Sequence, residues 1–216
     1  MSIPRRSGIA STETVRRRLL CARSIAVGIC LLLQTQVTFA QTDVFANTPI
    51  LEYYNSIIGP YFLSTPAEAA LIDTGSAGPG WGPTGRVFYV EPLAYVFYGA
   101  PVCRFYGSVI PGPNSHFFTV DPGECTYLKY LQSVTPPDQK RWNFEGIAFP
   151  AGIPQAGVCM PPYGTPVYRF YNNGFARGID SDHRYVTSPS DVLEMYGRGW
   201  TYEGVAFCAL YALSYP

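Results

Sequence analysis

The chain has 216 residues with 15 basic and 15 acidic side chains, and it is 47% hydrophobic, 15% aromatic and 14% charged. This composition excludes an intrinsically disordered chain. Six basic residues and one acidic residue lie in residues 1–40, which leaves 9 basic and 14 acidic side chains, a net charge of −5, in residues 41–216. That balance argues against a nucleic-acid-binding protein. The 21 Gly, 20 Pro and 17 Tyr favour short strands and many turns over long helices.

Residues 1–40 are typical of a secretory signal peptide. The basic segment Arg16–Arg18 precedes the apolar run Ser24–Leu33, and small residues occupy the cleavage-determining positions before Gln41. We therefore expect a mature chain with an N-terminal extension over 41–48. The apolar run is roughly half as long as a bilayer span, which favours cleavage over a membrane anchor and predicts no membrane span in the mature chain. The arginine run also fits a twin-arginine export signal loosely, so the export route stays open.

Four cysteines remain after the signal peptide: Cys103, Cys125, Cys159 and Cys208. An even number of cysteines in an exported chain predicts two disulfides and a secreted or periplasmic location. A zinc site is the alternative, but no two of these cysteines have the short spacing of zinc ligands, and we expect no cofactor. Three pairings are open to four cysteines. The repeats described next favour Cys103 with Cys208 and Cys125 with Cys159.

Three repeats account for the placement of the aromatic residues. Each of the three tryptophans opens a pattern of Trp, three residues, Gly, two residues and Phe, at Trp81–Phe88, Trp142–Phe149 and Trp200–Phe207. An aromatic block lies upstream of each tryptophan, at Glu52–Asn55, Arg104–Gly107 and Arg169–Asn172. We infer a single three-repeat domain over residues 49–216, with repeats at about 49–95, 96–160 and 161–210.

A helix start lies between the two blocks of each repeat. A capping residue, Pro at the first helical position and an acid two residues later occur at Thr65–Glu68, Asp121–Glu124 and Ser188–Asp191. These signals predict short helices over Pro66–Asp73, Pro122–Gln132 and Pro189–Tyr196, the last ended by Gly197.

A short segment of β-type composition precedes each cap, at 61–64, 117–120 and 184–187. The Gly between each Trp and Phe is expected to mark a β-bulge, which would bring both rings to one face. The predicted fold is therefore α+β and β-rich, with three degenerate strand-strand-helix-strand repeats packed with approximate threefold symmetry. One repeat alone is too small to bury its aromatic face.

At these blocks the chain resembles a bacterial secreted repeat family, domain of unknown function 5648. The resemblance covers about Pro49–Leu210, and its motifs are Pro101–Gly107, Ser115–Thr119, Gly123–Cys125, Phe144–Phe149, Pro166–Asn172 and His183–Tyr185. It implies an extracellular or periplasmic module and no particular reaction. The first repeat departs from the family pattern, because Gly59–Pro60 replaces the usual Asp-His before the second strand.

The two histidines occupy the same repeat position and are the first candidates for a site. Two polar clusters are expected around them, formed by His116, Glu145 and Arg104 and by His183, Glu203 and Arg169. The residues of these clusters would have one of two roles. They would act as ligand-binding or general-base groups, or they would form buried polar contacts that hold the strands together. In the first repeat Glu52 would pair with Arg86, so the acid and the arginine exchange strands relative to the other repeats. A pair that is kept while its charges exchange places favours the structural alternative.

Other chemistry has little support in the sequence. The chain lacks a nucleophile elbow, a zinc-protease helix and a phosphate loop after a strand. Asp180 and Asp182 together would suit Ca²⁺, but two acids in a loop are more often solvated. The tyrosines at 53, 54, 106 and 171 would suit stacking on sugar rings, although most are expected in the core. The sequence therefore favours an exported binding module for an unknown ligand, such as a glycan or cell-envelope component, over a hydrolase that uses His183 and Glu203.

Overall fold

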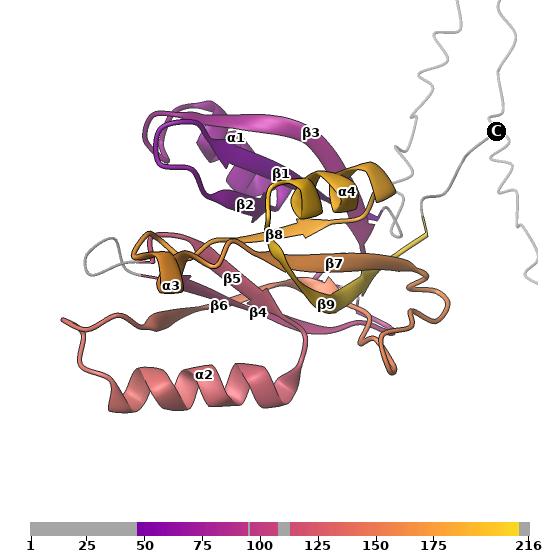
Figure 1. Ribbon diagram of the computed structural model, residues 1–216. Helices are drawn as coiled ribbons and strands as arrows, with labels where there is room; N and C mark the ends of the chain where they lie inside the picture. Colours follow the sequence, from indigo (N-terminus) through magenta and orange to yellow (C-terminus); the bar gives the residue numbers. More distant parts are fainter. Residues whose placement is uncertain (1–46, 95, 108–112, 212–216) are drawn as a thin grey trace, which may run out of the picture. The chain divides into compact units, whose positions relative to one another are not determined.

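The computed structural model describes residues 47–94, 96–107 and 113–211 (Figure 1). The chain divides into two units, residues 1–41 and 42–216. The expected signal peptide and most of the expected extension lie outside the described residues, so the features below all belong to the second unit.

Nine strands and four helices are formed by the described residues. In chain order they are β1 (Thr48–Asn55), β2 (Tyr61–Ser64), α1 (Pro66–Asp73), β3 (Trp81–Val90), β4 (Ala100–Gly107), β5 (His116–Thr119), α2 (Pro122–Val134), β6 (Trp142–Ala151), β7 (Thr165–Tyr171), α3 (Gly174–Arg177), β8 (His183–Val186), α4 (Pro189–Gly197) and β9 (Thr201–Ala209).

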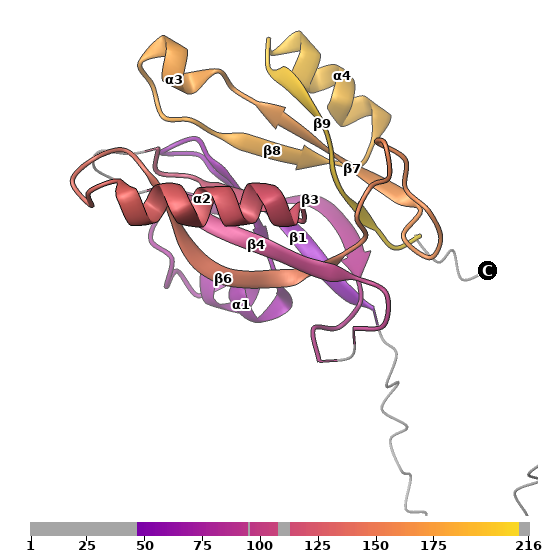
Figure 2. The same cartoon turned by 90° about the horizontal axis from the view of Figure 1, so that it is seen from below.

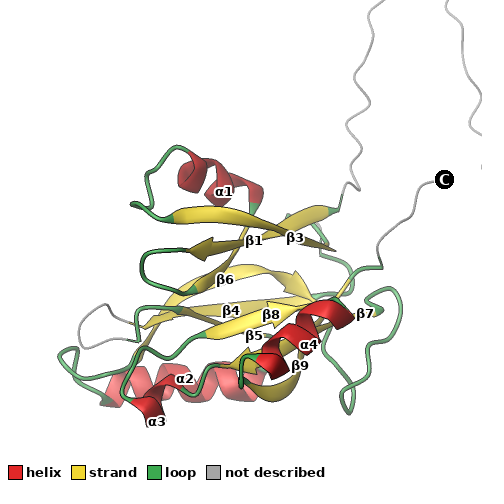
Figure 3. Cartoon of the chain, turned by 45° about the horizontal axis from the view of Figure 1, so that its top comes forward, coloured by secondary structure: helices red, strands yellow, loops and turns green. Residues whose placement is uncertain are grey.

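The strands form three antiparallel sheets of three strands each, in the orders β2-β1-β3, β5-β4-β6 and β8-β7-β9 (Figure 3). The first strand of each set is central, and a helix follows the second strand every time. We refer to these sets, with their helices, as the first, second and third sheet units. The β-rich α+β fold expected from the sequence is confirmed.

The helix starts follow the capping signals. Thr65 and Glu68 form a reciprocal capping box on α1, and Asp121 and Ser188 accept hydrogen bonds from the third backbone N–H of α2 and α4. The α2 helix continues to Val134 and lies along the second sheet (Figure 2), where Cys125 and Leu128 pack beside Phe105.

Two helical features differ from expectation. Gly197 does not stop α4 but belongs to it, and the chain turns at Gly199 with a φ of 74°. The four-residue helix α3, inside the loop between β7 and β8, was not expected at all, because a single helical turn carries too little sequence pattern to be distinguished from a loop.

The glycines between Trp and Phe mark bulges, as expected, but in the second and third units they do not bring the Trp and Phe rings into one cluster. Gly85, Gly146 and Gly204 all have positive φ, at 79°, 141° and 107°. The pairing of the central strand with the third strand shifts register near each of them. Bulges at these positions turn the chain so that the following Phe faces the core.

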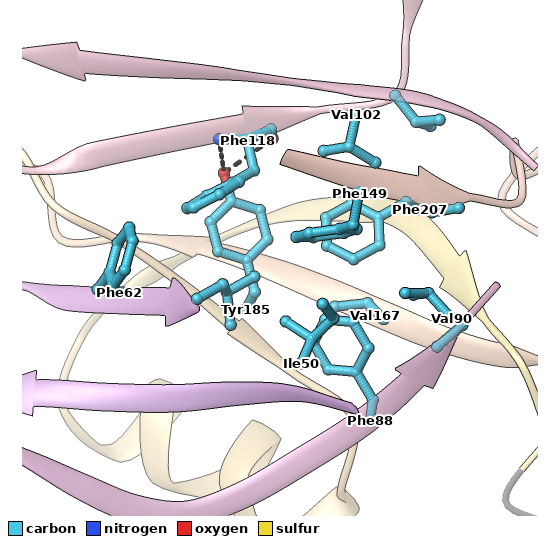
Figure 4. Packing of buried hydrophobic residues seen from close by; sticks show 14 of the residues in the cluster. Ile50, Phe62, Phe88, Val90, Val102, Phe118, Phe149, Val167, Tyr185 and Phe207 are labelled. Atoms are coloured by element: carbon cyan, nitrogen blue, oxygen red, sulfur yellow. Dashed lines mark hydrogen bonds between the residues drawn. The ribbon is translucent and has the colours of Figure 1, made fainter. Parts of the chain in front are cut away.

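The core is built from the same position of each sheet unit (Figure 4). Phe88, Phe149 and Phe207 meet with ring centroids 5.6–6.0 Å apart and are at most 7% exposed. Equivalent central-strand residues Ile50, Val102 and Val167, all fully buried, pack in the same cluster as these rings. The repeated Phe residues therefore share one core, whereas Trp142 and Trp200 pack in smaller clusters of the second and third units.

Two disulfides form, as expected, but each cysteine has a different partner from the one predicted. Cys103 on β4 bonds to Cys125 in the first turn of α2, and Cys159 bonds to Cys208 on β9. The first bond lies within one sheet unit, because Cys103 faces the helix that covers its own sheet. The second is possible because Gly152, in the linker before Cys159, pairs with Cys208 through backbone hydrogen bonds of 2.8 Å.

Candidate functional site

Arg104 organises the cluster expected around His116. Its Nε lies 2.8 Å from Glu145 Oε2, and His116 Nε2 lies 3.4 Å from the same oxygen. Arg104 also donates to Glu68, the acid of the α1 capping box, and its guanidinium lies 5.7 Å from the centre of the Phe62 ring. Burial acts to raise the pKa of Glu145, but the hydrogen bond from His116 and the charges of both neighbours lower it overall. This cluster joins the second sheet unit to the first.

Arg169 makes the same connection between the third and second units. Its Nε lies 2.8 Å from Glu203 Oε2, its terminal nitrogens lie 3.0 and 3.3 Å from the Glu124 carboxylate, and it stacks on Phe117 at 4.7 Å. The acid again belongs to a helix start, here that of α2. The structure thus brings together all six predicted candidate residues in the two expected clusters, and each cluster lies at a junction between sheet units.

His183 is the more buried of the two histidines. It is 7% exposed, its Nε2 lies 3.4 Å from Glu203, and its Nδ1 has no hydrogen-bond partner among the described residues. Burial, together with the nearby charge of Arg169, lowers the pKa of His183 to about 3. The ring is therefore neutral at physiological pH, and a histidine with this pKa is a weak general base.

We expect His183 to make the protein sensitive to acid. The unfolded chain protonates this ring below a pKa of about 6.5, whereas the folded chain resists protonation down to about 3, so stability declines as the pH falls through that window. When the pH falls from 6.5 to 4, the free energy of unfolding of the wild type should decrease by about 3 kcal/mol more than that of His183→Gln. Urea unfolding at the two pH values measures this difference. Equal losses in the two proteins would contradict a neutral, buried ring.

The third junction, between the third and first units, uses different positions. Arg184 lies 2.9 and 3.0 Å from the Glu52 carboxylate, and Arg86 binds Asp191, the acid of the α4 start, at 2.6–3.0 Å. The expected pair of Glu52 with Arg86 is therefore wrong, because each side chain points across the junction to the neighbouring unit instead of along its own sheet. The acids at the starts of α1, α2 and α4 each accept hydrogen bonds from an arginine of another unit.

The residue of the first unit that is equivalent to the two histidines also differs from the expected one. Strand pairing sets Tyr61 opposite Tyr54, as His116 lies opposite Tyr106 and His183 opposite Tyr171. The histidines are the first residues of their strands, so their equivalent is Tyr61, one residue beyond the expected Gly59–Pro60. The Tyr61 hydroxyl accepts a hydrogen bond of 2.8 Å from Arg198.

A groove that the sequence analysis did not predict is lined by residues from the ends of three hairpins. The turn between β1 and β2 and the loop that contains α3 lie on the left side of Figure 1. Its cavity volume is about 440 Å³. The turn before β2, the segment before β5 and the loop before β8 contribute the same three positions each, namely Ile58–Pro60, Pro113–Ser115 and Asp180–Asp182. The remaining wall residues are Tyr54, Asn172, Arg177, Ile179, Arg198 and Trp200. We call this feature the hairpin groove.

Asp182 is the most unusual group of the hairpin groove. It is 5% exposed, and neither carboxylate oxygen makes a hydrogen bond of ordinary geometry with the described residues. Burial raises its pKa well above the usual value, and the nearby backbone N–H groups of Tyr61 and His183 only partly oppose this effect. A buried polar group without a partner reduces stability, so its presence at a cavity wall calls for a functional explanation.

Replacing this carboxyl group should stabilise the protein at neutral pH. Because the folded-state pKa of Asp182 lies above the unfolded value, the folded state is favoured in acid and loses stability as the pH rises through the folded pKa. Asp182→Asn removes this titration while keeping the shape of the side chain. We expect the variant to be more stable than the wild type at pH 8 and similar at pH 4, as measured by urea unfolding. A variant less stable than the wild type at pH 8 would show that the carboxylate is ionised and paired.

No family model, curated protein or solved structure matches the chain. Among residues 47–94, 96–107 and 113–211, no helix is both long and apolar enough to cross a membrane. The same residues contain no group of three or more His, Cys, Asp or Glu side chains placed to hold a metal ion, and all four of their cysteines are bonded as disulfides.

Proposed function

We propose that the protein is an exported binding module whose hairpin groove takes a glycan of the cell envelope or its surroundings. The observation that carries the proposal is the composition of the groove wall, which combines Trp200 and Tyr54 with the hydrogen-bonding groups of Asn114, Asp180 and Arg198. Flat apolar rings beside amide, carboxylate and guanidinium groups suit a sugar, which has apolar ring faces and hydroxyl edges.

Export is supported by the sequence features of residues 1–40 and by the two disulfides, which persist in oxidising compartments. The resemblance to the secreted repeat family, domain of unknown function 5648, supports the same location. A binding role also agrees with the placement of the groove on loops held by a disulfide-linked scaffold.

We also infer that the three sheet units are degenerate repeats about an approximate threefold axis. Their common strand order, the near-equal separations of the three core Phe rings and the three junctions between a helix-start acid and an arginine support this inference. In this arrangement the hairpin ends of all three repeats converge at one place, which is why a single groove would form from three turns.

The hydrolase alternative has less support. Its two residues, His183 and Glu203, belong to a junction between sheet units, and neither lines the hairpin groove. The low pKa of His183 also makes it a poor base at neutral pH.

The test is a glycan and peptidoglycan array with the protein recovered from an exporting host. We expect binding that Trp200→Ala weakens about tenfold or more, because the substitution removes a stacking face worth about 1.4 kcal/mol. Trp81→Ala is the matched control, since Trp81 packs against Phe62 and the core and does not line the groove. Unfolding curves confirm that both variants fold. Binding that survives Trp200→Ala but not Trp81→Ala would refute the assignment of the groove.

A further inference from the structure

The hairpin groove shares part of its wall with a second cavity. This cavity has a volume of about 160 Å³, and Trp142, Phe175 and Lys140 are among its lining residues. Pro113, Ile179 and Ser181 line both cavities, so the two share a wall. The Ser115 hydroxyl donates to the Ser181 carbonyl, which holds this wall to the segment before β5. Each cavity thus has a tryptophan at one side and an edge in common with the other.

The basic side chains are concentrated around these two cavities. Residues 41–216 hold nine Lys and Arg side chains. Four of them form the ion pairs at the junctions between sheet units, and Lys129 lies 3.7 Å from the centre of the Phe144 ring. The other four all line the two cavities, and they are Lys140, Arg141, Arg177 and Arg198.

Two of these four cations are available to a ligand. Within the described part of the chain, neither Lys140 nor Arg177 forms an ion pair with a carboxylate; Lys140 lies near the Phe175 ring, and Arg177 donates to the Asn172 carbonyl. Arg141 and Arg198 are anchored by hydrogen bonds to the Thr135 carbonyl and the Tyr61 hydroxyl. In a region of net charge −5, this clustering favours an anionic ligand.

We propose that the hairpin groove and the second cavity together bind one linear, carboxylate-bearing polysaccharide. This inference rests on the proposed function and names its substrate class. Sugar rings lie against Trp200 in the groove and against Trp142 in the second cavity, while Arg177 and Lys140 each face a carboxylate of the polymer. The Asp180 carboxylate accepts hydrogen bonds from sugar hydroxyls.

Single-stranded nucleic acid is the other polymer that combines flat rings with negative charge. Single-stranded nucleic acid fits the wall less well, because its backbone has few hydroxyl groups, whereas every ring of a uronate polymer has hydroxyls that can donate to the Asp180 carboxylate.

The experiment titrates the exported protein with short and long oligogalacturonates and with their methyl esters, which lose the charge and keep the sugar. We expect the long acid to bind about tenfold more tightly than its ester, and the difference to shrink at high salt. Arg177→Gln should weaken both the short and the long acid, whereas Lys140→Gln should weaken the long acid alone, because only the long polymer reaches the second cavity. Lys129→Gln is the control and should bind like the wild type.

The outcomes separate this inference from the proposed function. Equal affinity for acid and ester, or binding that is insensitive to Lys140→Gln, overturns the acidic-polymer inference and leaves the glycan module standing. Binding to no glycan of the array or of this series overturns both. Tighter binding of a single-stranded oligonucleotide than of the long acid overturns the choice of polymer.

Discussion

Replacing Arg184 by methionine is expected to reduce the free energy of unfolding by about 3–5 kcal/mol. The side chains of Arg184 and Glu52 are only 5% and 3% exposed and lie 2.9 Å apart. The substitution leaves the Glu52 carboxylate buried with Thr84 as its remaining side-chain partner. Since a typical domain has about 5–15 kcal/mol of stability in total, the variant should unfold at a far lower urea concentration than the wild type.

The double variant Glu52→Leu with Arg184→Met tests the cause. If the cost arises from an uncompensated buried charge, removing the charge as well should restore much of the loss. Lys129→Met is the control, because that ammonium is at an exposed position on α2 and its ring contact contributes about 1 kcal/mol or less. A double variant less stable than Arg184→Met alone would mean that the ion pair matters through its shape rather than its charge.

Removal of the Cys159–Cys208 bond is expected to cost about 4 kcal/mol, because it closes a segment of 49 residues. Removal of the Cys103–Cys125 bond, which closes 22 residues, should cost about 3 kcal/mol. Paired Cys→Ala variants compared by urea unfolding measure both losses. The order of the two effects follows from the entropy of the unfolded chain, which a longer closed segment restricts more.

Peptide mapping under non-reducing conditions checks the pairing on which this order depends. The expected fragments join Cys103 to Cys125 and Cys159 to Cys208. A fragment that joins Cys103 to Cys208 would contradict the structure and restore the pairing that the repeat order favoured.

Local features of the sequence predicted the elements well. The capping residues Thr65, Asp121 and Ser188 each accept the N–H expected of them, since such signals act within a few residues. The glycines before each core Phe have the positive φ that a bulge requires. The β-rich class and the shared aromatic core followed from these same repeated positions.

Features that depend on the direction of a side chain were harder to predict. Arg86 was assigned to Glu52 because both lie on one sheet, yet it points across a junction to Asp191. Cys103 was assigned to a distant strand, although it faces the helix of its own unit. Neither direction can be derived from a repeat pattern, which records equivalent positions but not the rotation between units.

The hairpin groove could not be predicted from the sequence for the same reason. Its wall combines turns from three separate parts of the chain, and Asp182 was considered only as a calcium ligand with Asp180. The repeat comparison did contain one signal: both histidines are preceded by a polar residue, Ser115 or Asp182, where the first unit has Pro60. All three of these residues line the groove.

The most direct test of the proposed glycan binding is the response of the three indole N–H signals in the NMR spectrum of the protein. Titration with a long oligogalacturonate should shift the signals of Trp200 and Trp142, which line the two cavities, and leave that of Trp81 in place. Single Trp→Phe variants assign the three signals. A shift of the Trp81 signal alone, or no shift of the Trp200 signal at saturating ligand, would contradict the account.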